Sequence, residues 1–228
     1  NTFYKEFGTM LKTGLNSDFG NRERLSKLLR FQTSKRDELT SFDQYIELAD
    51  KEAKKIYYLS AESLETAKRN PNMEYFKKND IEVLFLTDPI DSFVIPQLYK
   101  YEDYELISID KADFDNDDNT EDEENKESNK LVEAIKEILG DQVADVKESK
   151  RLVDSPCTIV AGKDGMDAQT ERMMKMMDKN FEGAKKVFEV NLGHNILKNL
   201  STYFDKNGSD DNFKKIVEQL YGSALLIE

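Results

Sequence analysis

The sequence contains a single cysteine, Cys157, and a single histidine, His194. One cysteine excludes a disulfide framework within the chain and favours a reducing compartment. One cysteine and one histidine also fall short of a closed zinc site, which takes four ligands. We therefore predict no disulfide and no metal site, with His194 as a turn residue before a helix.

Long apolar runs and basic clusters are also scarce. No stretch approaches the 18 consecutive apolar residues that indicate a transmembrane helix. The formal net charge is −13, with 33 Lys and Arg against 46 Asp and Glu. Phosphate binding requires clustered Lys and Arg, so this balance argues against nucleic acid and against anionic membrane surfaces as partners. We expect a cytoplasmic, protein-binding chain.

Catalytic and phosphate-binding motifs are missing. The ten glycines are scattered and form neither G-x-x-x-x-G-K nor G-x-G-x-x-G. Cys157 lies in a strand-like run, where a buried structural thiol is commoner than a nucleophile. Asp88 and Asp91 follow an apolar strand, where α/β proteins often bind ligands. A turn at Asp88 and an early-helix position for Asp91 explain both without a ligand, and we predict no catalytic residue.

The two ends of the sequence are unusual. Asn1 begins the chain without an initiator Met or a signal-peptide pattern. Residues 224–228 lie within an apolar helical run that has no Gly or Pro stop signal. We expect both ends to be cuts in a longer protein.

Hydrophobic periodicity predicts an α/β (α+β) fold, and the first domain covers residues 1–112. It opens with a helical hairpin, in which Gly14 ends the first helix and Asn21 caps the second. A capping box at 41–44 opens a third helix. Strand-like runs at 55–59 and 81–86 flank a further helix, which predicts a parallel crossover and a small α/β/α layer.

The second domain, residues 129–228, is predicted to be another small α/β unit that ends in helices. Its first helix, 131–139, is amphipathic and is followed by Gly140. The expected strands are 143–146, 152–153, 157–160 and 186–190. Two further helices are expected at 196–204 and 213–224.

An acidic linker is predicted between the domains, at residues 113–128. Residues 110–127 contain ten acidic residues and two lysines, and such a run resists ordering because like charges repel. Asp113, Asp115, Asp117 and Glu124 fall at calcium-loop positions 1, 3, 5 and 12. Asp118 stands where that loop requires Gly, so the solvated linker is the preferred interpretation.

Five of the seven methionines fall between positions 166 and 177. A helix starting at Asp164 or Gly165 would place one stripe on a single face, composed of Met166, Thr170, Met173, Met174 and Met177. Flexible, polarisable Met suits a surface that repacks against many partners, but Met stripes also fill ordinary cores. Composition gives the two interpretations equal weight.

Several strings resemble the ninety-kilodalton heat-shock chaperone family. They are 3–8 (FYKEFG), 21–25 (NRERL), 28–34 (LLRFQTS), 55–59 (KIYYL), 82–91 (EVLFLTDPID) and 151–157 (RLVDSPC). The resemblance implies the second half of a middle domain followed by most of a C-terminal domain. The methionine helix is similar to the bacterial, HtpG-type version, since the eukaryotic cytosolic pattern has Trp where Met166 stands.

The resemblance also implies functional residues. Client contacts carry over to Phe93, Met166, Thr170, Met173, Met174 and Met177, with Thr170 a departure because Met is usual there. The dimer-forming helix carries over to Phe213, Ile216, Val217, Leu220 and Ala224, and the family's final helix is not present. ATP and magnesium belong to the full-length protein, whose nucleotide domain precedes this segment, so this part is expected to be no enzyme itself.

Three functions therefore compete. The preferred one is a chaperone fragment that binds partly folded clients, with co-chaperones as further partners and a homodimer in the full-length protein. The second is a structural dimerisation module, with the methionine stripe buried as core. The third is a stand-alone α/β enzyme using Cys157 or Asp88, which lacks an accompanying base, metal set or phosphate loop.

Overall fold

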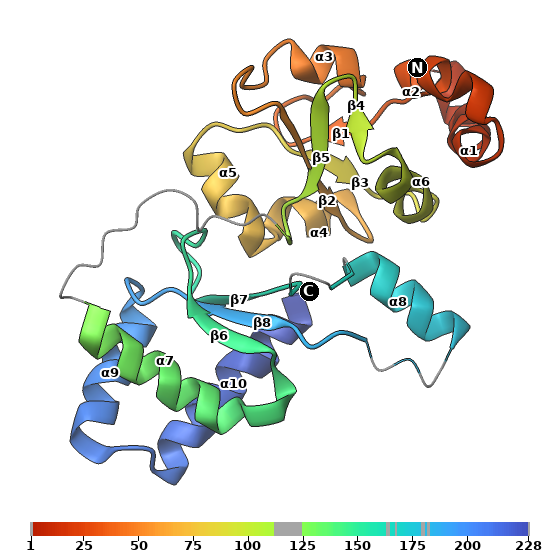
Figure 1. The fold of residues 1–228 in the computed structure, drawn as a ribbon. Helices are drawn as coiled ribbons and strands as arrows, with labels where there is room; N and C mark the ends of the chain where they lie inside the picture. The colour runs from red at the N-terminus through yellow and green to blue at the C-terminus, as the bar shows by residue number, and fades with distance from the viewer. Residues whose placement is uncertain are drawn as a thin grey trace. The chain divides into compact units, whose positions relative to one another are not determined.

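The computed structural model describes residues 2–111, 125–162, 165–166, 168–178, 181 and 183–227. The chain forms two compact units (Figure 1). Unit 1 comprises Asn1–Arg69, Phe76–Ala112 and Asp167–Phe181, and unit 2 comprises Asn70–Tyr75, Asp113–Met166 and Glu182–Glu228. Neither unit is continuous in sequence, because the segment 70–75 groups with unit 2 and the methionine helix groups with unit 1.

Unit 1 opens with the predicted helical hairpin, made by α1 (Thr2–Ser17), the 3-10 turn η1 (Phe19–Asn21) and α2 (Arg22–Leu28). The prediction that Gly14 ends the first helix is wrong, because α1 continues to Ser17. A Cβ atom at Gly14 would lie 3.3 Å from Leu25 Cδ1. The glycine therefore permits close packing of α1 on α2 and does not terminate the helix.

The sheet of unit 1 has five strands in the order β1-β3-β2-β5-β4. The strands are β1 (Gln32–Thr33), β2 (Lys55–Ser60), β3 (Leu84–Leu86), β4 (Lys100–Tyr101) and β5 (Tyr104–Ser108). The predicted parallel pairing of β2 with β3 is confirmed, with Tyr58 opposite Leu84. β2 also pairs in parallel with β5, and the two edge strands are antiparallel to their neighbours.

Helices complete unit 1. They are α3 (Phe42–Ile46), α4 (Leu64–Arg69), α6 (Asp91–Leu98), α8 (Ala168–Met177) and, from Phe76 onward, α5 (Glu74–Lys78), whose first two residues group with unit 2. The capping box predicted for α3 is confirmed: Ser41 Oγ accepts from the Gln44 N–H, and Gln44 Oε1 accepts from the Ser41 N–H. In the core of this unit, the ring of Phe42 packs against the rings of Phe31 and Tyr101.

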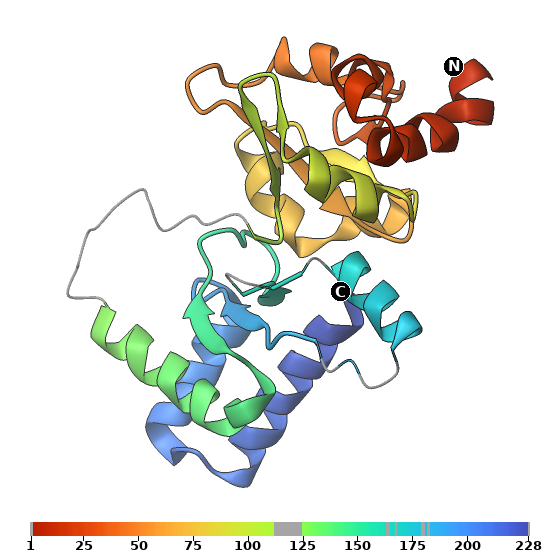
Figure 2. The same cartoon turned by 45° about the vertical axis from the view of Figure 1, so that its right-hand side comes forward.

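Unit 2 has a three-stranded sheet in the order β6-β8-β7. The strands are β6 (Asp145–Glu148), β7 (Cys157–Val160) and β8 (Val187–Val190), and β6 runs parallel to β8 while β7 runs antiparallel to it. The helices are α7 (Asn125–Leu139), α9 (Asn195–Asn207) and α10 (Asp211–Ile227). In both views these helices lie on one face of the sheet (Figures 1 and 2).

Local signals explain most boundaries in unit 2. Gly140 follows α7 with φ +49°, a left-handed conformation that glycine adopts without strain. The predicted strand at 152–153 is wrong, because these residues lie in a loop whose N–H groups bind the side chain of Glu74. Glu74 belongs to the segment 70–75, which also includes the 3-10 turn η2 (Pro71–Met73).

The predicted linker falls largely outside the described residues. The calcium-loop positions Asp113, Asp115, Asp117 and Glu124 all lie there. The last predicted linker residues, 125–128, belong to α7. Across the described ranges, no helix combines the length and the apolar character needed to cross a membrane.

Candidate protein-interaction surface

Helix α8 buries a charged residue and exposes methionines. Glu171 is 5% exposed, whereas Met176 is 83% and Met177 is 75% exposed. The buried carboxylate is paired with Lys175, whose Nζ lies 2.7 Å from Glu171 Oε1. A helix that served only as core would bury its apolar side chains, whereas α8 leaves its last two methionines exposed and buries one carboxylate.

One ion pair joins α8 to the rest of unit 1, and two further polar contacts lie within the helix and at its end. Arg172 forms an ion pair with Glu62, in the loop between β2 and α4. Glu171 is paired one turn away with Lys175, and the Asp178 N–H donates to the Met174 carbonyl at 2.8 Å at the end of the helix. None of these contacts involves the side chain of Met176 or Met177, and both thioethers lie at the surface.

Helix α6 contacts α8 and contributes an exposed aromatic side chain. Phe93 is 43% exposed, although its neighbours Val94 and Ile95 are each 1% exposed and belong to the core. The structure therefore brings the predicted Phe93 and the methionine helix onto adjacent helices of one unit. We call Phe93, Met173, Met174, Met176 and Met177 the methionine surface.

The first turn of α6 is held by a buried ion pair. Lys12 Nζ of α1 lies 2.6 Å from Asp91 Oδ1 and 3.3 Å from Asp88 Oδ2. Asp88 also accepts the Ile90 N–H through Oδ1 at 3.2 Å, which closes the turn predicted there. Asp88 and Asp91 are thus occupied by structural contacts that orient the helix bearing Phe93.

The other predicted contact residues differ in position. Thr170, Met173 and Met174 lie on α8 and are partly exposed. Met166 is 40% exposed but precedes α8, which begins at Ala168. The predicted helix start at Asp164 or Gly165 is therefore wrong. The Gly165 N–H donates to the Gly162 carbonyl at 2.9 Å, and a Cβ at Gly165 would lie 3.1 Å from the Gly162 backbone. Gly165 therefore forms a tight turn, and helical spacing does not extend to Met166.

Met176 is a surface residue that sequence reasoning missed. It is the most exposed methionine of the chain, yet it lies outside the stripe derived from Met166 and Thr170. Its position three residues after Met173 was the available signal, since side chains at i and i+3 are neighbours on a helix.

The predicted dimer-forming residues divide into two groups. Phe213, Val217 and Ala224 are buried in the core of unit 2, and Leu220 packs against that core. Ile216 is 37% exposed. The same helix, α10, also exposes Leu226 by 89%. The core-facing side chains are already occupied within unit 2, so only the outer face of α10 is free for a further contact.

Cys157 and His194 are both accounted for by local structure. Cys157 lies on β7, is 6% exposed, and its pKa is raised to about 11 by burial. A thiol with this pKa carries almost no thiolate at neutral pH. His194 caps α9, where Nδ1 accepts the Ile196 N–H at 3.1 Å. Where the structure describes the chain, no cluster of three or more metal-ligand side chains is found.

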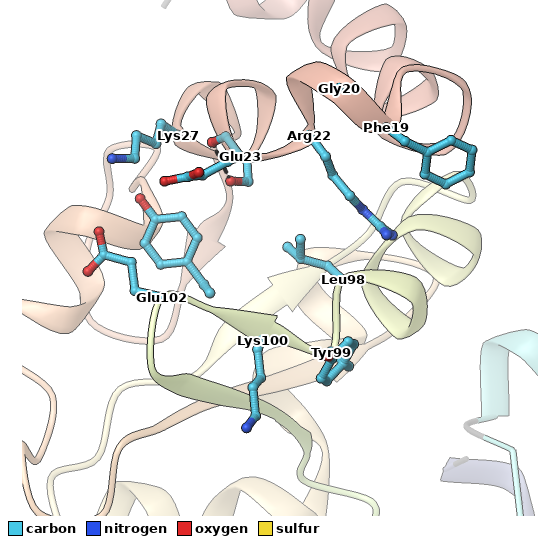
Figure 3. A pocket seen from close by; sticks show the side chains of 11 residues that line it. Phe19, Gly20, Arg22, Glu23, Lys27, Leu98, Tyr99, Lys100 and Glu102 are labelled. Atoms are coloured by element: carbon cyan, nitrogen blue, oxygen red, sulfur yellow. Dashed lines mark hydrogen bonds between the residues drawn. The ribbon is translucent and has the colours of Figure 1, made fainter.

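A hollow of about 500 Å³ lies between the α1–α2 turn and the start of β4 (Figure 3). Arg22 extends from the helical turn towards Leu98. The basic side chains of Arg22, Lys27 and Lys100 line the hollow together with the acidic Glu23 and Glu102. Neither cysteine nor histidine is among the lining residues, and the mixed charge favours no particular ligand.

Comparison with known proteins identifies the class of this fold. The family described as "Hsp90 protein" matches residues 1–227. The chain belongs to this family, which the resemblance had indicated.

Among individual relatives, the HtpG chaperones are similar over the whole chain. "Chaperone protein HtpG" of Chlorobium phaeovibrioides is 47% identical over 233 residues, covering 100% of this chain and 37% of the relative. The HtpG of Treponema denticola is 40% identical over 240 residues, with the same coverage. "Heat shock protein 90-5, chloroplastic" of Arabidopsis thaliana is 39% identical over 234 residues, covering 98% of this chain and 30% of that protein. The chain thus spans 30% to 37% of the length of these relatives.

Proposed function

We propose that this chain binds partly folded client proteins as part of an ATP-driven chaperone, and that the methionine surface is its contact site. The observation that carries the proposal is the orientation of α8, in which Glu171 is buried while Met176 and Met177 are exposed. The names of the relatives, chaperone and heat shock protein, support the same function.

The physical basis is the burial of apolar surface. A partly folded client exposes apolar side chains, and covering them stabilises the complex by roughly 25 cal/mol per Å² of apolar area, less the cost of association. Methionine is unbranched and polarisable, so the same surface can adapt to differently shaped clients. Phe93 adds a rigid aromatic contact beside the flexible thioethers.

In this proposal, ATP binding and hydrolysis take place in another part of a longer protein. ATP and magnesium would be bound outside these 228 residues, since the sequence has no phosphate-binding motif. Repositioning of the methionine surface by the nucleotide cycle, recruitment of co-chaperones and a cytoplasmic location are parts of this proposal that come from the family resemblance.

Replacement of the exposed thioethers tests the proposal. We expect the combined substitutions Met173→Ser, Met174→Ser, Met176→Ser and Met177→Ser to weaken binding of a reduced, carboxymethylated unfolded protein roughly tenfold or more, which corresponds to about 1.4 kcal/mol. Fluorescence anisotropy of the labelled unfolded protein measures the dissociation constant.

Met10 supplies the matched control. It is 69% exposed on α1, outside the methionine surface, so Met10→Ser changes an exposed thioether without touching the proposed site. The unfolding midpoints of both variants should match the unsubstituted chain. Equal binding by the fourfold variant and the control, at equal stability, would contradict the proposal.

Self-association through α10 is a second part of the proposed function. Leu225, Leu226 and Ile227 are 45%, 89% and 47% exposed, and such contiguous apolar side chains favour a protein contact. We propose that this end of α10 contributes to the homodimer that the family resemblance implies. Sedimentation velocity over a range of concentrations tests whether the chain dimerises by itself.

A further inference from the structure

The exposed methionines of α8 also form a site of chemical modification. We propose that hydrogen peroxide oxidises Met176 and Met177 faster than the buried Met73 and Cys157, and that the sulfoxides of Met176 and Met177 switch off client binding. This inference rests on the proposed function of the methionine surface, and adds a means by which that surface is regulated.

The exposure of the methionine side chains sets the expected order of oxidation. Met176 and Met177 are 83% and 75% exposed, and Met10 and Met166 are 69% and 40% exposed. Met73 is fully buried, at 0%. Susceptibility to oxidation follows access of the oxidant to sulfur, so α8 presents the two most accessible thioethers next to one another.

Cys157 does not compete for the oxidant. A reactive cysteine is normally oxidised through its thiolate. The thiol of Cys157 is buried on β7, where the Leu220 carbonyl lies 3.6 Å from Sγ. Burial raises the pKa of Cys157 to about 11, so almost none of it is ionised at neutral pH. Peroxide should therefore react with the exposed methionines before it reacts with the thiol of Cys157.

The reaction balances with peroxide as the only co-reactant. The thioether sulfur attacks one peroxide oxygen, the O–O bond breaks, and an S–O bond forms. Sulfur loses two electrons to give the sulfoxide, and the remaining oxygen leaves as water after proton transfer. Reversal requires an external thiol-dependent reductase, because the chain has a single cysteine and cannot form an internal disulfide.

Oxidation changes the property on which the proposed binding depends. A sulfoxide is polar and accepts hydrogen bonds, so a client's apolar side chain would have to displace water from it. The four methionines Met173, Met174, Met176 and Met177 lie within two turns of α8. Oxidation of Met176 and Met177 therefore places polar oxygen atoms on much of the methionine surface, while Phe93 remains unchanged.

The experiment treats the 228-residue chain with hydrogen peroxide, removes the peroxide with catalase, and then adds the reduced, carboxymethylated unfolded protein. Peptide mass spectrometry follows sulfoxide at each methionine. We expect Met176 and Met177 to react roughly tenfold faster than Met73, and client affinity to fall in step with their conversion. Treatment with both methionine sulfoxide reductases, one for each sulfoxide epimer, should restore binding.

Leucine variants assign the effect to these positions. Met176→Leu with Met177→Leu cannot form a sulfoxide at either position, so peroxide should leave the affinity of this variant at its own value before oxidation. Met10→Leu is the matched control, and its binding should be lost on oxidation as in the unsubstituted chain. Loss of binding in the Met176/Met177 variant, or full binding by the oxidised unsubstituted chain, overturns the inference. Absence of binding before oxidation contradicts the proposed function instead, and the two failures are thereby distinguished.

Discussion

Lys12 Nζ lies 2.6 Å from Asp91 Oδ1, and the two side chains are only 6% and 2% exposed. Burial alone would lower the pKa of Lys12, but attraction to Asp91 and the hydrogen bond with it outweigh burial and raise that pKa. Burial raises the pKa of Asp91, against the opposing attraction of Lys12. The pair joins α1 to the first turn of α6, the helix that carries Phe93.

Removal of Lys12 should therefore be costly. Lys12→Met keeps the aliphatic stem but leaves the carboxylate of Asp91 buried without its cation, and the expected loss of unfolding free energy is about 3–5 kcal/mol. Lys54→Ala is the matched control, because its ion pair with Asp103 is solvent-exposed and should contribute little to stability. Urea denaturation measures both, and equal midpoints for the two variants would refute the structural role of Lys12.

Glu74 gives a pH-dependent contribution to stability. Its carboxylate accepts the backbone N–H groups of Val153, Asp154 and Ser155, and the Ser155 hydroxyl. Partial burial by itself would raise the pKa of Glu74, but these hydrogen bonds together lower it below the ordinary value of 4.5. A lowered folded-state pKa means that the stabilisation is complete above pH 4.5 and is lost as the pH falls through the folded-state value.

We therefore expect Glu74→Gln to lower the unfolding free energy by about 1–3 kcal/mol at neutral pH, and the difference from the unsubstituted chain to shrink below pH 4.5. Urea denaturation at a series of pH values provides the measurement. Glu65→Gln is the control, because Glu65 pairs with Arg69 at the surface of α4. A stability difference for Glu74→Gln that stays constant down to acid pH would show that the carboxylate charge is not responsible.

The fold was predicted where a local signal was strong. The capping box of α3, the glycine after α7 and the apolar strands β2 and β3 each depend on adjacent residues, and the structure confirms them. Strands β4 and β5 were missed, because Lys100–Ser108 mixes Tyr, Glu and Lys without clear alternation. Pairing with β2 makes β5 a strand, and no single stretch of sequence contains that tertiary information.

The candidate site was predictable only in part. The resemblance pointed to Phe93, and residue type together with the resemblance pointed to the methionine run. Spacing misplaced the stripe, because Gly165 forms a turn against Gly162. The inward orientation of Glu171 could not be inferred either. It depends on contacts of α8 with residues that are distant in sequence, such as Glu62 and those of the α6 helix. The spacing of residues within α8 contains no information about such tertiary contacts.

Cys157 should react slowly with thiol reagents in the native protein. Burial on β7 limits access and raises its pKa to about 11, so the thiolate fraction at pH 8 is on the order of one in a thousand. We expect modification by Ellman's reagent to be roughly a hundredfold or more slower in buffer than in denaturing urea. A native rate similar to that in urea would contradict the buried position of the thiol.

The two faces of helix α10 should have different roles: the buried face stabilises unit 2, and the exposed face is the proposed dimer contact. Phe213 is 0% exposed and its ring centroid lies 5.0 Å from that of Phe204, so Phe213→Ala should cost about 3–5 kcal/mol through the cavity it leaves. Leu226 is 89% exposed, so Leu226→Ser should change the stability of the monomer by less than about 0.5 kcal/mol.

If the proposed contact forms through the outer face, Leu226→Ser should shift the sedimentation coefficient towards that of the monomer at concentrations where the unsubstituted chain dimerises. If the unsubstituted chain sediments as a monomer at every concentration, α10 alone is not sufficient for dimerisation. The predicted difference in stability between the Phe213 and Leu226 variants does not depend on that result.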